Sequence, residues 1–216
     1  KKVDSIGIER IKFMTSHPWD FTDELIEVLG SSKNIMPFLH LPVQSGSNEV
    51  LKKMGRRYTK ESYLELVNKI KAKVPGIALT TDIIVGFPTE TEEDFNETLD
   101  LVDKVEYSGA YTFIYSPREN TVAAKFESTV NEKEAKRRLY LLNDKINYYS
   151  LKDNKKYQDK IVKVLVTSLG KEKGVYQGYT EHNKVINVSS EENIIGQIVD
   201  VKVTDVKTWS INGIKI

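Results

Sequence analysis

Up to about residue 130, short apolar runs alternate with stretches whose apolar residues recur at helical spacing. The apolar runs are Gly7–Thr15, Met36–Val43, Leu79–Val85 and Ala110–Tyr115. The stretches with helical spacing are Thr22–Leu29, Asn48–Met54, Glu61–Val74 and Glu92–Val105. Alternating strands and helices predict a parallel α/β sheet with helices outside it, either open or closed as a barrel.

The pattern changes beyond residue 130. A highly charged segment from Asn131 to about Tyr157 carries an apolar stripe and predicts a connecting helix. Apolar and polar residues then alternate with period two in residues 161–166, 174–179, 184–188 and 198–203. Short strands separated by Gly and Asn turns predict a small all-β barrel or sandwich. We therefore expect two domains, residues 1–152 and residues 153–216.

Composition narrows the possible chemistry. With 39% hydrophobic and 29% charged residues the chain can build an ordinary core. No apolar run approaches the roughly 20 residues that span a bilayer, and no signal-peptide pattern opens the chain, so we expect a cytoplasmic protein. The sequence has no cysteine, which excludes disulfides, a thiolate nucleophile and cysteine-held zinc or iron–sulfur clusters within it. The 3 histidines are far apart and predict no metal site.

Polar and small residues follow each expected strand of the first domain. They are Thr15–Pro18, Gln44–Ser47, Gly86–Pro88 and Ser116–Arg118. The carboxyl ends of parallel strands are where ligands bind in such folds. Each motif alone also fits a structural role. Ser47 could simply cap the next helix, and Asp82 could be a buried polar residue with a backbone partner.

The motifs occur together and in a fixed order. The series is Thr-Ser-His-Pro (15–18), His-Leu-Pro-Val-Gln-Ser-Gly-Ser (40–47), Val-Leu-x-x-Met-x-Arg (50–56), Thr-Asp-Ile-Ile-Val-Gly-Phe-Pro (81–88) and Tyr-Ser-Pro-Arg (115–118). This series resembles the MiaB-type tRNA methylthiotransferases of the radical-SAM family, and the tail from Asp159 on resembles their TRAM domain. The resemblance covers essentially the whole chain. It implies the last four strands of a partial (β/α) barrel, followed by a small antiparallel, OB-like barrel.

The resemblance also implies roles for individual residues. Gln44 and Asp82 would hold the ribose hydroxyls of S-adenosylmethionine, and Arg56 its carboxylate, chemistries that suit an amide, a carboxylate and a guanidinium. The residues expected to flank the adenine are Val85, Gly86 and Phe87. Those expected on the substrate side are Ser16, His17, Tyr115, Ser116 and Arg118. No catalytic residue and no metal ligand is assigned to this chain.

The tail is expected to bind RNA. From Lys152 onward there are 11 Lys and Arg against 8 Asp and Glu, a local charge of +3 that hints at a polyanionic partner. The cations expected to contact phosphates are Lys160, Lys163, Lys184, Lys202 and Lys207. Bases could stack on Tyr176, Tyr179 or Trp209.

The family's reaction extends beyond this chain. The resemblance implies methylthiolation of isopentenyladenosine next to the anticodon of tRNA, with S-adenosylmethionine and two 4Fe-4S clusters whose ligands this sequence lacks. A flavodoxin- or ferredoxin-type protein would supply electrons. The chain would then be a carboxy-terminal fragment, inactive alone, whose first strand was paired to missing strands. Two alternatives stay open. They are the threonylcarbamoyladenosine branch of the family and an RNA-binding module without catalysis.

Overall fold

The computed structural model describes residues 2–13, 17–119 and 121–216, and these fall into two compact units. One unit, the α/β unit, contains Phe13–Ser32 and Leu39–Ile146. The other, the barrel unit, contains the segment up to Lys12 together with Lys33–Phe38 and Asn147–Ile216. No helix among the described residues combines the length and apolarity needed to cross a membrane.

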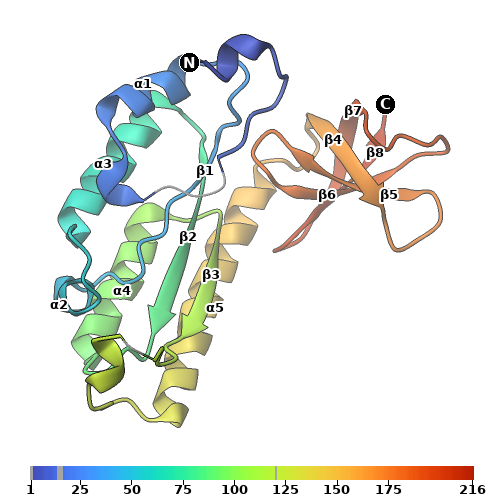
Figure 1. Cartoon of the computed structure of the whole chain (residues 1–216). Helices are drawn as coiled ribbons and strands as arrows, with labels where there is room; N and C mark the ends of the chain where they lie inside the picture. The colour runs from blue at the N-terminus through green and yellow to red at the C-terminus, as the bar shows by residue number, and fades with distance from the viewer. Residues whose placement is uncertain (1, 14–16, 120) are drawn as a thin grey trace. The chain divides into compact units, whose positions relative to one another are not determined.

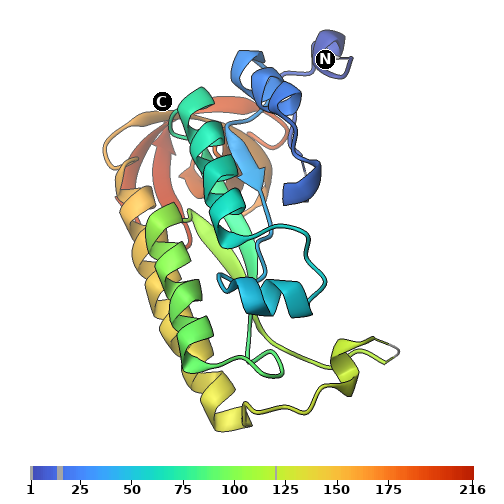
Figure 2. The ribbon, with the colours of Figure 1, turned by 90° about the vertical axis from the view of Figure 1, so that its left-hand side faces the viewer.

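The α/β unit is built on a three-stranded sheet in the order β1-β2-β3. The strands are β1 (Phe38–His40), β2 (Ala78–Val85) and β3 (Gly109–Ile114). Strands β2 and β3 run parallel, with Thr80 opposite Gly109 and Val85 opposite Ile114. The helices are α1 (Asp23–Ser31), α2 (Asn48–Lys53), α3 (Lys60–Lys73), α4 (Glu92–Val105) and α5 (Glu132–Lys155). Helices α3 and α4 lie side by side against the sheet (Figures 1 and 2).

Local capping explains where these helices begin. Thr22, Ser47, Thr59 and Thr91 each precede a helix and accept a backbone N–H with the side-chain hydroxyl. At Thr91 the bond is reciprocal, because Asp94 also accepts the Thr91 N–H. Such caps satisfy the free N–H groups of the first helical turn, and short polar side chains suit them best.

The two faces of β2 differ in burial. Thr81, Ile83 and Val85 are fully buried, whereas Asp82 and Ile84 between them are half-buried. Successive side chains of a strand point to opposite faces of the sheet, so one face packs into the core. Asp82 lies on the other face, opposite the exposed Tyr111 of β3.

The expected α/β class is confirmed, but one expected strand is not found among the described residues. Within Gly7–Thr15, the described residues form a single bridge, between Ile11 and Ile35. Arg10 in this segment instead donates to the backbone oxygens of Tyr179 (2.8 Å) and Lys163 (2.9 Å). The segment therefore belongs to the barrel unit because its guanidinium binds main-chain carbonyls there.

The barrel unit contains the expected small closed barrel. Its strands are β4 (Ile161–Leu169), β5 (Val175–Thr180), β6 (Val185–Ser189), β7 (Ile198–Val206) and β8 (Ile211–Lys215). They close in the order β4-β5-β6-β8-β7. Strands β6 and β8 pair in parallel, whereas the other neighbours are antiparallel. The sequence pattern did not predict β8.

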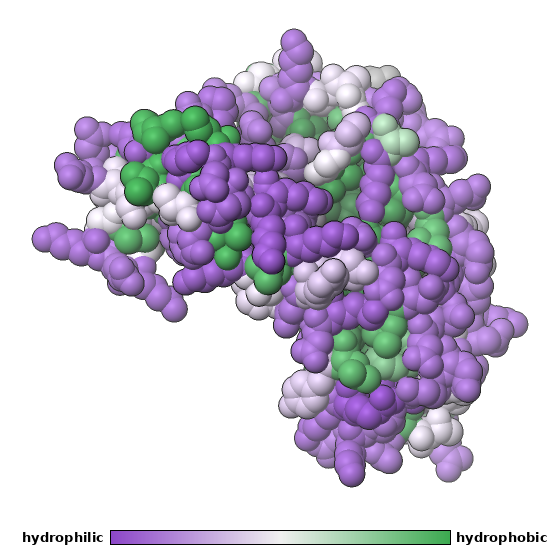
Figure 3. Space-filling model, turned by 180° about the vertical axis from the view of Figure 1, so that it is seen from behind, coloured by the Kyte–Doolittle hydropathy of each residue, from purple (hydrophilic) through white to green (hydrophobic). Residues whose placement is uncertain are grey.

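The barrel core is small and tightly packed. Alternate residues of its strands, such as Val164, Val201 and Ile211, are fully buried in one cluster. A Cβ atom at Gly178 would lie 2.3 Å from the Leu165 backbone oxygen, so only glycine fits there. Figure 3 shows mostly hydrophilic side chains on the face seen from behind, with smaller hydrophobic areas between them. Exposed hydrophobic side chains of the barrel include Leu169 and Trp209.

Candidate cofactor site at the carboxyl ends of the strands

Gln44 and Asp82 come together at the carboxyl ends of β1 and β2. The Gln44 N–H donates to the Asp82 backbone oxygen, and the Ile84 N–H donates to that of Gln44, both at 2.9 Å. His40 Nε2 lies 3.3 Å from Asp82 Oδ1, and His40 Nδ1 lies 3.0 Å from Thr80 Oγ1. The Asp82 carboxylate thus points away from the helix layer, as its expected role requires.

The loop after Gln44 is hydrogen-bonded to helix α4. The Gly46 N–H donates to Thr98 Oγ1 at 2.9 Å, and the Ser47 hydroxyl donates to Asp94 Oδ1 at 2.5 Å. A Cβ atom at position 46 would lie 2.5 Å from the Glu97 backbone oxygen, so the approach requires glycine. Gln44 itself has a φ of 72°, a left-handed conformation that is costly outside glycine and tends to mark functional sites.

Arg56 lies beside the end of β1 together with His17 and Tyr58. Arg56 Nη1 is 3.3 Å from His17 Nε2, and the rings of His17 and Tyr58 meet edge to face at 5.8 Å. The Tyr58 hydroxyl donates to the Val43 backbone oxygen at 3.1 Å, and burial raises the pKa of Tyr58. Among the described residues, the buried Arg56 Nε has no hydrogen-bond partner. A carboxylate would satisfy that donor, so Arg56 fits the expected ligand group.

The residues expected to flank an adenine are less accessible. Val85 is completely buried and Phe87 is 2% exposed, with its ring edge to face against Tyr115 at 5.1 Å. Gly86 between them has a φ of 70°. Any contact of Val85 or Phe87 with a ligand would therefore be made by the backbone rather than by the side chains.

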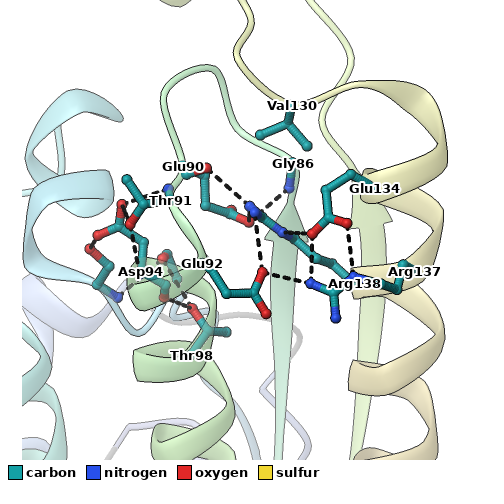
Figure 4. A network of polar contacts seen from close by, with 12 residues as sticks. Gly86, Glu90, Thr91, Glu92, Asp94, Thr98, Val130, Glu134, Arg137 and Arg138 are labelled. Carbon is teal, nitrogen blue, oxygen red and sulfur yellow. Dashed lines mark hydrogen bonds and ion pairs between the residues drawn. The ribbon is translucent and has the colours of Figure 1, made fainter.

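A buried ion pair anchors the turn that follows β2 (Figure 4). Glu90 Oε1 accepts the Gly86 N–H at 3.2 Å and lies 2.7 Å from Arg138 Nη1 of helix α5. The same Nη1 donates to the Glu90 backbone oxygen at 3.0 Å, and Arg138 Nε donates to Glu134 at 2.8 Å. Burial raises the pKa of Glu90, which the bond to Arg138 offsets only in part.

Sequence reasoning gave no role to this ion pair. Glu90 and Arg138 are 48 residues apart, and Arg138 lies within a helix rich in charged residues. Charged residues on a helix are mostly exposed, whereas Arg138 is 5% exposed. Its position within the apolar stripe of α5, four residues before the buried Leu142, was the available signal.

The residues expected on the substrate side are scattered. Tyr115 joins the end of β2, because its N–H donates to the Val85 backbone oxygen at 2.9 Å. Its hydroxyl is buried, and no described residue forms a hydrogen bond with it. Ser116 and Arg118 lie exposed in the loop beyond β3. His17 is beside Arg56, as described above. Ser16 lies outside the described residues.

One of the lysines expected to bind RNA is not on the surface. Lys184 is 8% exposed, and its Nζ lies 2.5 Å from Asp153 Oδ2. Burial lowers the pKa of Lys184, which the pairing with Asp153 offsets only in part. The prediction for Lys184 is therefore wrong, because a buried, paired ammonium cannot reach a phosphate. The expected lysines that are exposed are Lys160, Lys163, Lys202 and Lys207.

Comparison with known proteins matches two parts of the chain to domain families. The model of the radical SAM superfamily matches residues 1–102, and that of the TRAM domain matches residues 155–216. The chain is 54% identical over 96% of its length to a Bacillus cytotoxicus protein called tRNA-2-methylthio-N(6)-dimethylallyladenosine synthase. It is 53% identical over 99% of its length to the Oceanobacillus iheyensis protein of that name. The chain covers 41% of each relative.

A solved structure supports the fold. Coproporphyrinogen III oxidase (HemN) from Escherichia coli, described as a radical SAM enzyme, superposes with a TM-score of 0.51. The two proteins are 20% identical, and the match covers 67% of this chain and 32% of the other. At that identity the likeness concerns the fold alone. The chain therefore combines a radical SAM region with a TRAM domain, and over most of its length it is similar to synthases of the MiaB type, of which it spans 41%.

Proposed function

We propose that this chain is part of an enzyme that adds a methylthio group to N6-dimethylallyladenosine (isopentenyladenosine) next to the anticodon of tRNA. The observation that carries the proposal is the 54% identity over 96% of the chain to a synthase whose name states this product. The names of the relatives specify the dimethylallyl nucleoside. They therefore favour this branch over the threonylcarbamoyladenosine branch.

In the proposed enzyme, the ends of β1 and β2 bind S-adenosylmethionine. The backbone pairing of Gln44 with Asp82 supports a shared role at the ribose, where an amide and a carboxylate can each bind a hydroxyl. The buried Arg56 Nε, which has no partner within the described parts of the chain, supports a role at the methionyl carboxylate. When bound, this cofactor supplies the radical and methyl-donor chemistry. The chain's own residues orient it and exclude water.

The residues of this chain do not fit an iron–sulfur cluster. The sequence contains no cysteine, and the described residues include no cluster of histidines and carboxylates suited to a metal. We propose that both 4Fe-4S clusters are held by protein outside this chain, and that a flavodoxin- or ferredoxin-type partner reduces them. We also propose that the enzyme acts in the cytoplasm, which a tRNA substrate supports.

The barrel is the proposed binding surface for tRNA. Lys160 and Lys207 are exposed, and Trp209 is 60% exposed, so phosphates and a base could be bound there. Lys163 is also exposed but lies 3.3 Å from Asp200, and Lys202 donates to the Asp159 backbone oxygen. We expect these two lysines to contribute less, because RNA must compete with partners within the barrel.

A chimera tests the proposal. This chain replaces the matching part of the Bacillus cytotoxicus synthase, and the chimera is expressed in a strain that lacks its own synthase. Mass spectrometry of tRNA nucleosides should then detect 2-methylthio-N6-dimethylallyladenosine. Detection of the methylthiolated threonylcarbamoyl nucleoside instead would favour the second branch of the family. No modification, combined with tRNA binding by the chain, would favour the RNA-binding module.

Variants of the chimera test the cofactor site. Asp82→Ala should weaken binding of S-adenosylmethionine roughly 10- to 150-fold, the usual cost of losing a hydrogen bond to a charged group. Glu65→Ala removes an exposed carboxylate from α3 and serves as the control. Isothermal titration calorimetry measures both affinities. Equal affinity of the two variants would remove Asp82 from the site.

A further inference from the structure

We propose that the α/β unit carries its own surface for single-stranded RNA, formed by Trp19 with Lys52, Lys53 and Arg57. This rim surface would hold the nucleotides next to the base that enters the candidate site. The inference rests on the proposed function, because it assumes that tRNA approaches the carboxyl ends of the strands. It adds RNA contacts that are separate from the barrel.

The cations lie at the rim of the candidate site. Helix α2 begins directly after the Gln44–Ser47 loop, and Lys52 and Lys53 form its last turn. Lys53 Nζ donates to Thr89 Oγ1 at 2.7 Å, which ties the end of α2 to the turn that follows β2. Lys53 therefore borders the turn that follows β2, while the first residue of α2 follows the loop after β1.

Among the described residues the rim cations form no ion pair, although Lys53 interacts electrostatically with Asp94 of helix α4. Residues 52–60 contain five Lys and Arg and no Asp or Glu. Lys60 pairs with Glu97 and Asp100, but within the described parts of the chain Lys52, Lys53 and Arg57 form no ion pair and are exposed.

The basic residues further along α3 are different. Lys69 lies 3.2 Å from Asp23, and Lys73 lies 2.5 Å from Glu27, both acids of helix α1. The two α3 lysines are thus paired with acids of α1, whereas the three rim cations form no ion pair among the described residues. Unpaired cations around a site attract a polyanion, because their field is not cancelled locally.

Trp19 adds an aromatic platform to the same surface. Its side chain is 59% exposed, although it belongs to an ordered turn, Pro18–Asp20. His17 fixes that turn, because its Nδ1 accepts the Trp19 N–H at 3.3 Å while its Nε2 lies 3.3 Å from Arg56 Nη1. The contact of His17 with Arg56 thus links the turn that carries the indole to the residue before Arg57. Single-stranded RNA binds surfaces that combine an exposed aromatic ring, on which bases stack, with cations that hold phosphates.

The charge contribution is tested with a matched pair of variants. Lys52→Ala/Arg57→Ala removes two rim cations and leaves Lys53 on Thr89, whereas Lys69→Ala/Lys73→Ala removes two paired cations. Fluorescence anisotropy measures binding of an anticodon stem-loop RNA to the chain and to the chimera from about 50 to about 200 mM salt. The rim variant should lower the salt slope by roughly 0.7 for each lost phosphate contact. The control should bind like the parent.

The stacking contribution is tested at Trp19. Trp19→Ala should weaken binding of the stem-loop roughly 5- to 150-fold without changing the salt slope, because a stacked base carries no counterion. Trp19→Phe should restore most of the affinity. A fully paired RNA duplex should not distinguish Trp19→Ala from the parent. Circular dichroism of each variant checks that the fold is intact.

The outcomes separate this inference from the proposed function. The chimera could modify tRNA while Lys52→Ala/Arg57→Ala and Trp19→Ala both bind RNA like the parent. In that case the rim surface is refuted and the proposed function stands. If the rim variant loses binding of a flavodoxin-type protein but not of RNA, the surface docks an acidic protein and the inference is overturned. If the parent binds no stem-loop and the chimera modifies no tRNA, both proposals fail.

Discussion

Helix α5 takes part in a buried ion pair near each end, and the two pairs are built differently. Near its start, Arg138 binds the Glu90 carboxylate, the Glu90 backbone oxygen and Glu134. Near its end, Asp153 pairs with Lys184 of the barrel unit. Arg138 is 5% exposed and Lys184 is 8% exposed, so burial alone does not distinguish them. The difference lies in the number of partners.

That difference follows from the two cations. A guanidinium presents five N–H donors in a planar fork and can satisfy several acceptors at once. An ammonium is a compact charge, and burial lowers the pKa of Lys184 although Asp153 opposes the shift. Arg138 therefore fixes the turn after β2 through both the backbone oxygen and the carboxylate of Glu90, while Glu134 orients the guanidinium. Lys184 forms one ion pair, with Asp153, which connects α5 to the segment before β6.

The largest effect is expected from breaking the arginine network. Arg138→Ala leaves Glu90 buried without its cation and should lower the free energy of unfolding by about 3–5 kcal/mol. Arg137→Ala is the matched control, since Arg137 is the neighbouring arginine, also pairs with Glu134, and is exposed. Urea unfolding of the chain, followed by circular dichroism, measures both. Equal losses for the two variants would refute a special role for Arg138.

Removing the whole pair sharpens this test. The double variant Arg138→Met/Glu90→Leu leaves no buried charge, so its stability should lie well above that of Arg138→Ala. Gly86 loses its side-chain acceptor in the double variant. A chimera that carries the double variant should therefore bind S-adenosylmethionine more weakly than the parent chimera, even where its stability recovers.

A smaller effect is expected at the other end of α5. Lys184→Met keeps the apolar stem but removes the charge, and should lower the free energy of unfolding by roughly 1–3 kcal/mol. The loss is smaller because Asp153 still accepts from Lys156 Nζ at 2.8 Å. The same urea titration measures it. A loss as large as that of Arg138→Ala would show that the number of partners does not set the cost.

The smallest effect expected is a dependence of the free energy of unfolding on pH, caused by His182 of the barrel unit. Burial lowers the pKa of His182 from 6.5, although Asp153 and Glu181 oppose the shift, while Lys184 and Lys156 add to it. The unfolded chain thus binds a proton at a pH where the folded chain does not. Stability should be complete above pH 6.5 and fall as the pH drops below it. Urea midpoints at about pH 7.5 and about pH 5.5 measure this fall, and His182→Asn should reduce it.

Local patterns predicted many of the elements well. Helix α4 has the expected bounds, Glu92–Val105, because its capping box at Thr91 and its apolar spacing are both short-range signals. The expected strand Leu79–Val85 differs from β2 by one residue at its start. The candidate site also followed from the sequence in part. The ends of neighbouring strands meet at one edge of a sheet, and Gln44 and Asp82 do so here.

Other features depended on contacts between distant residues. Charge alone suggested that Lys184 is exposed, but Asp153 and the barrel enclose it. The pattern of Gly7–Thr15 suggested a strand, but Arg10 finds its acceptors 153 and 169 residues away. Strand β8 is short, and it is held by pairing with both β6 and β7.

The sequence by itself determined the helices, most strands, the family resemblance and the edge of the sheet at which the candidate site lies. These depend on neighbouring residues, where capping and periodicity act over a few positions. Tertiary structure alone decided which charges are buried, as at Arg138, and which stay free, as at Lys52 and Arg57. The physical reason is that a charge loses its water only where distant segments close over it, and its partner there can come from anywhere in the chain.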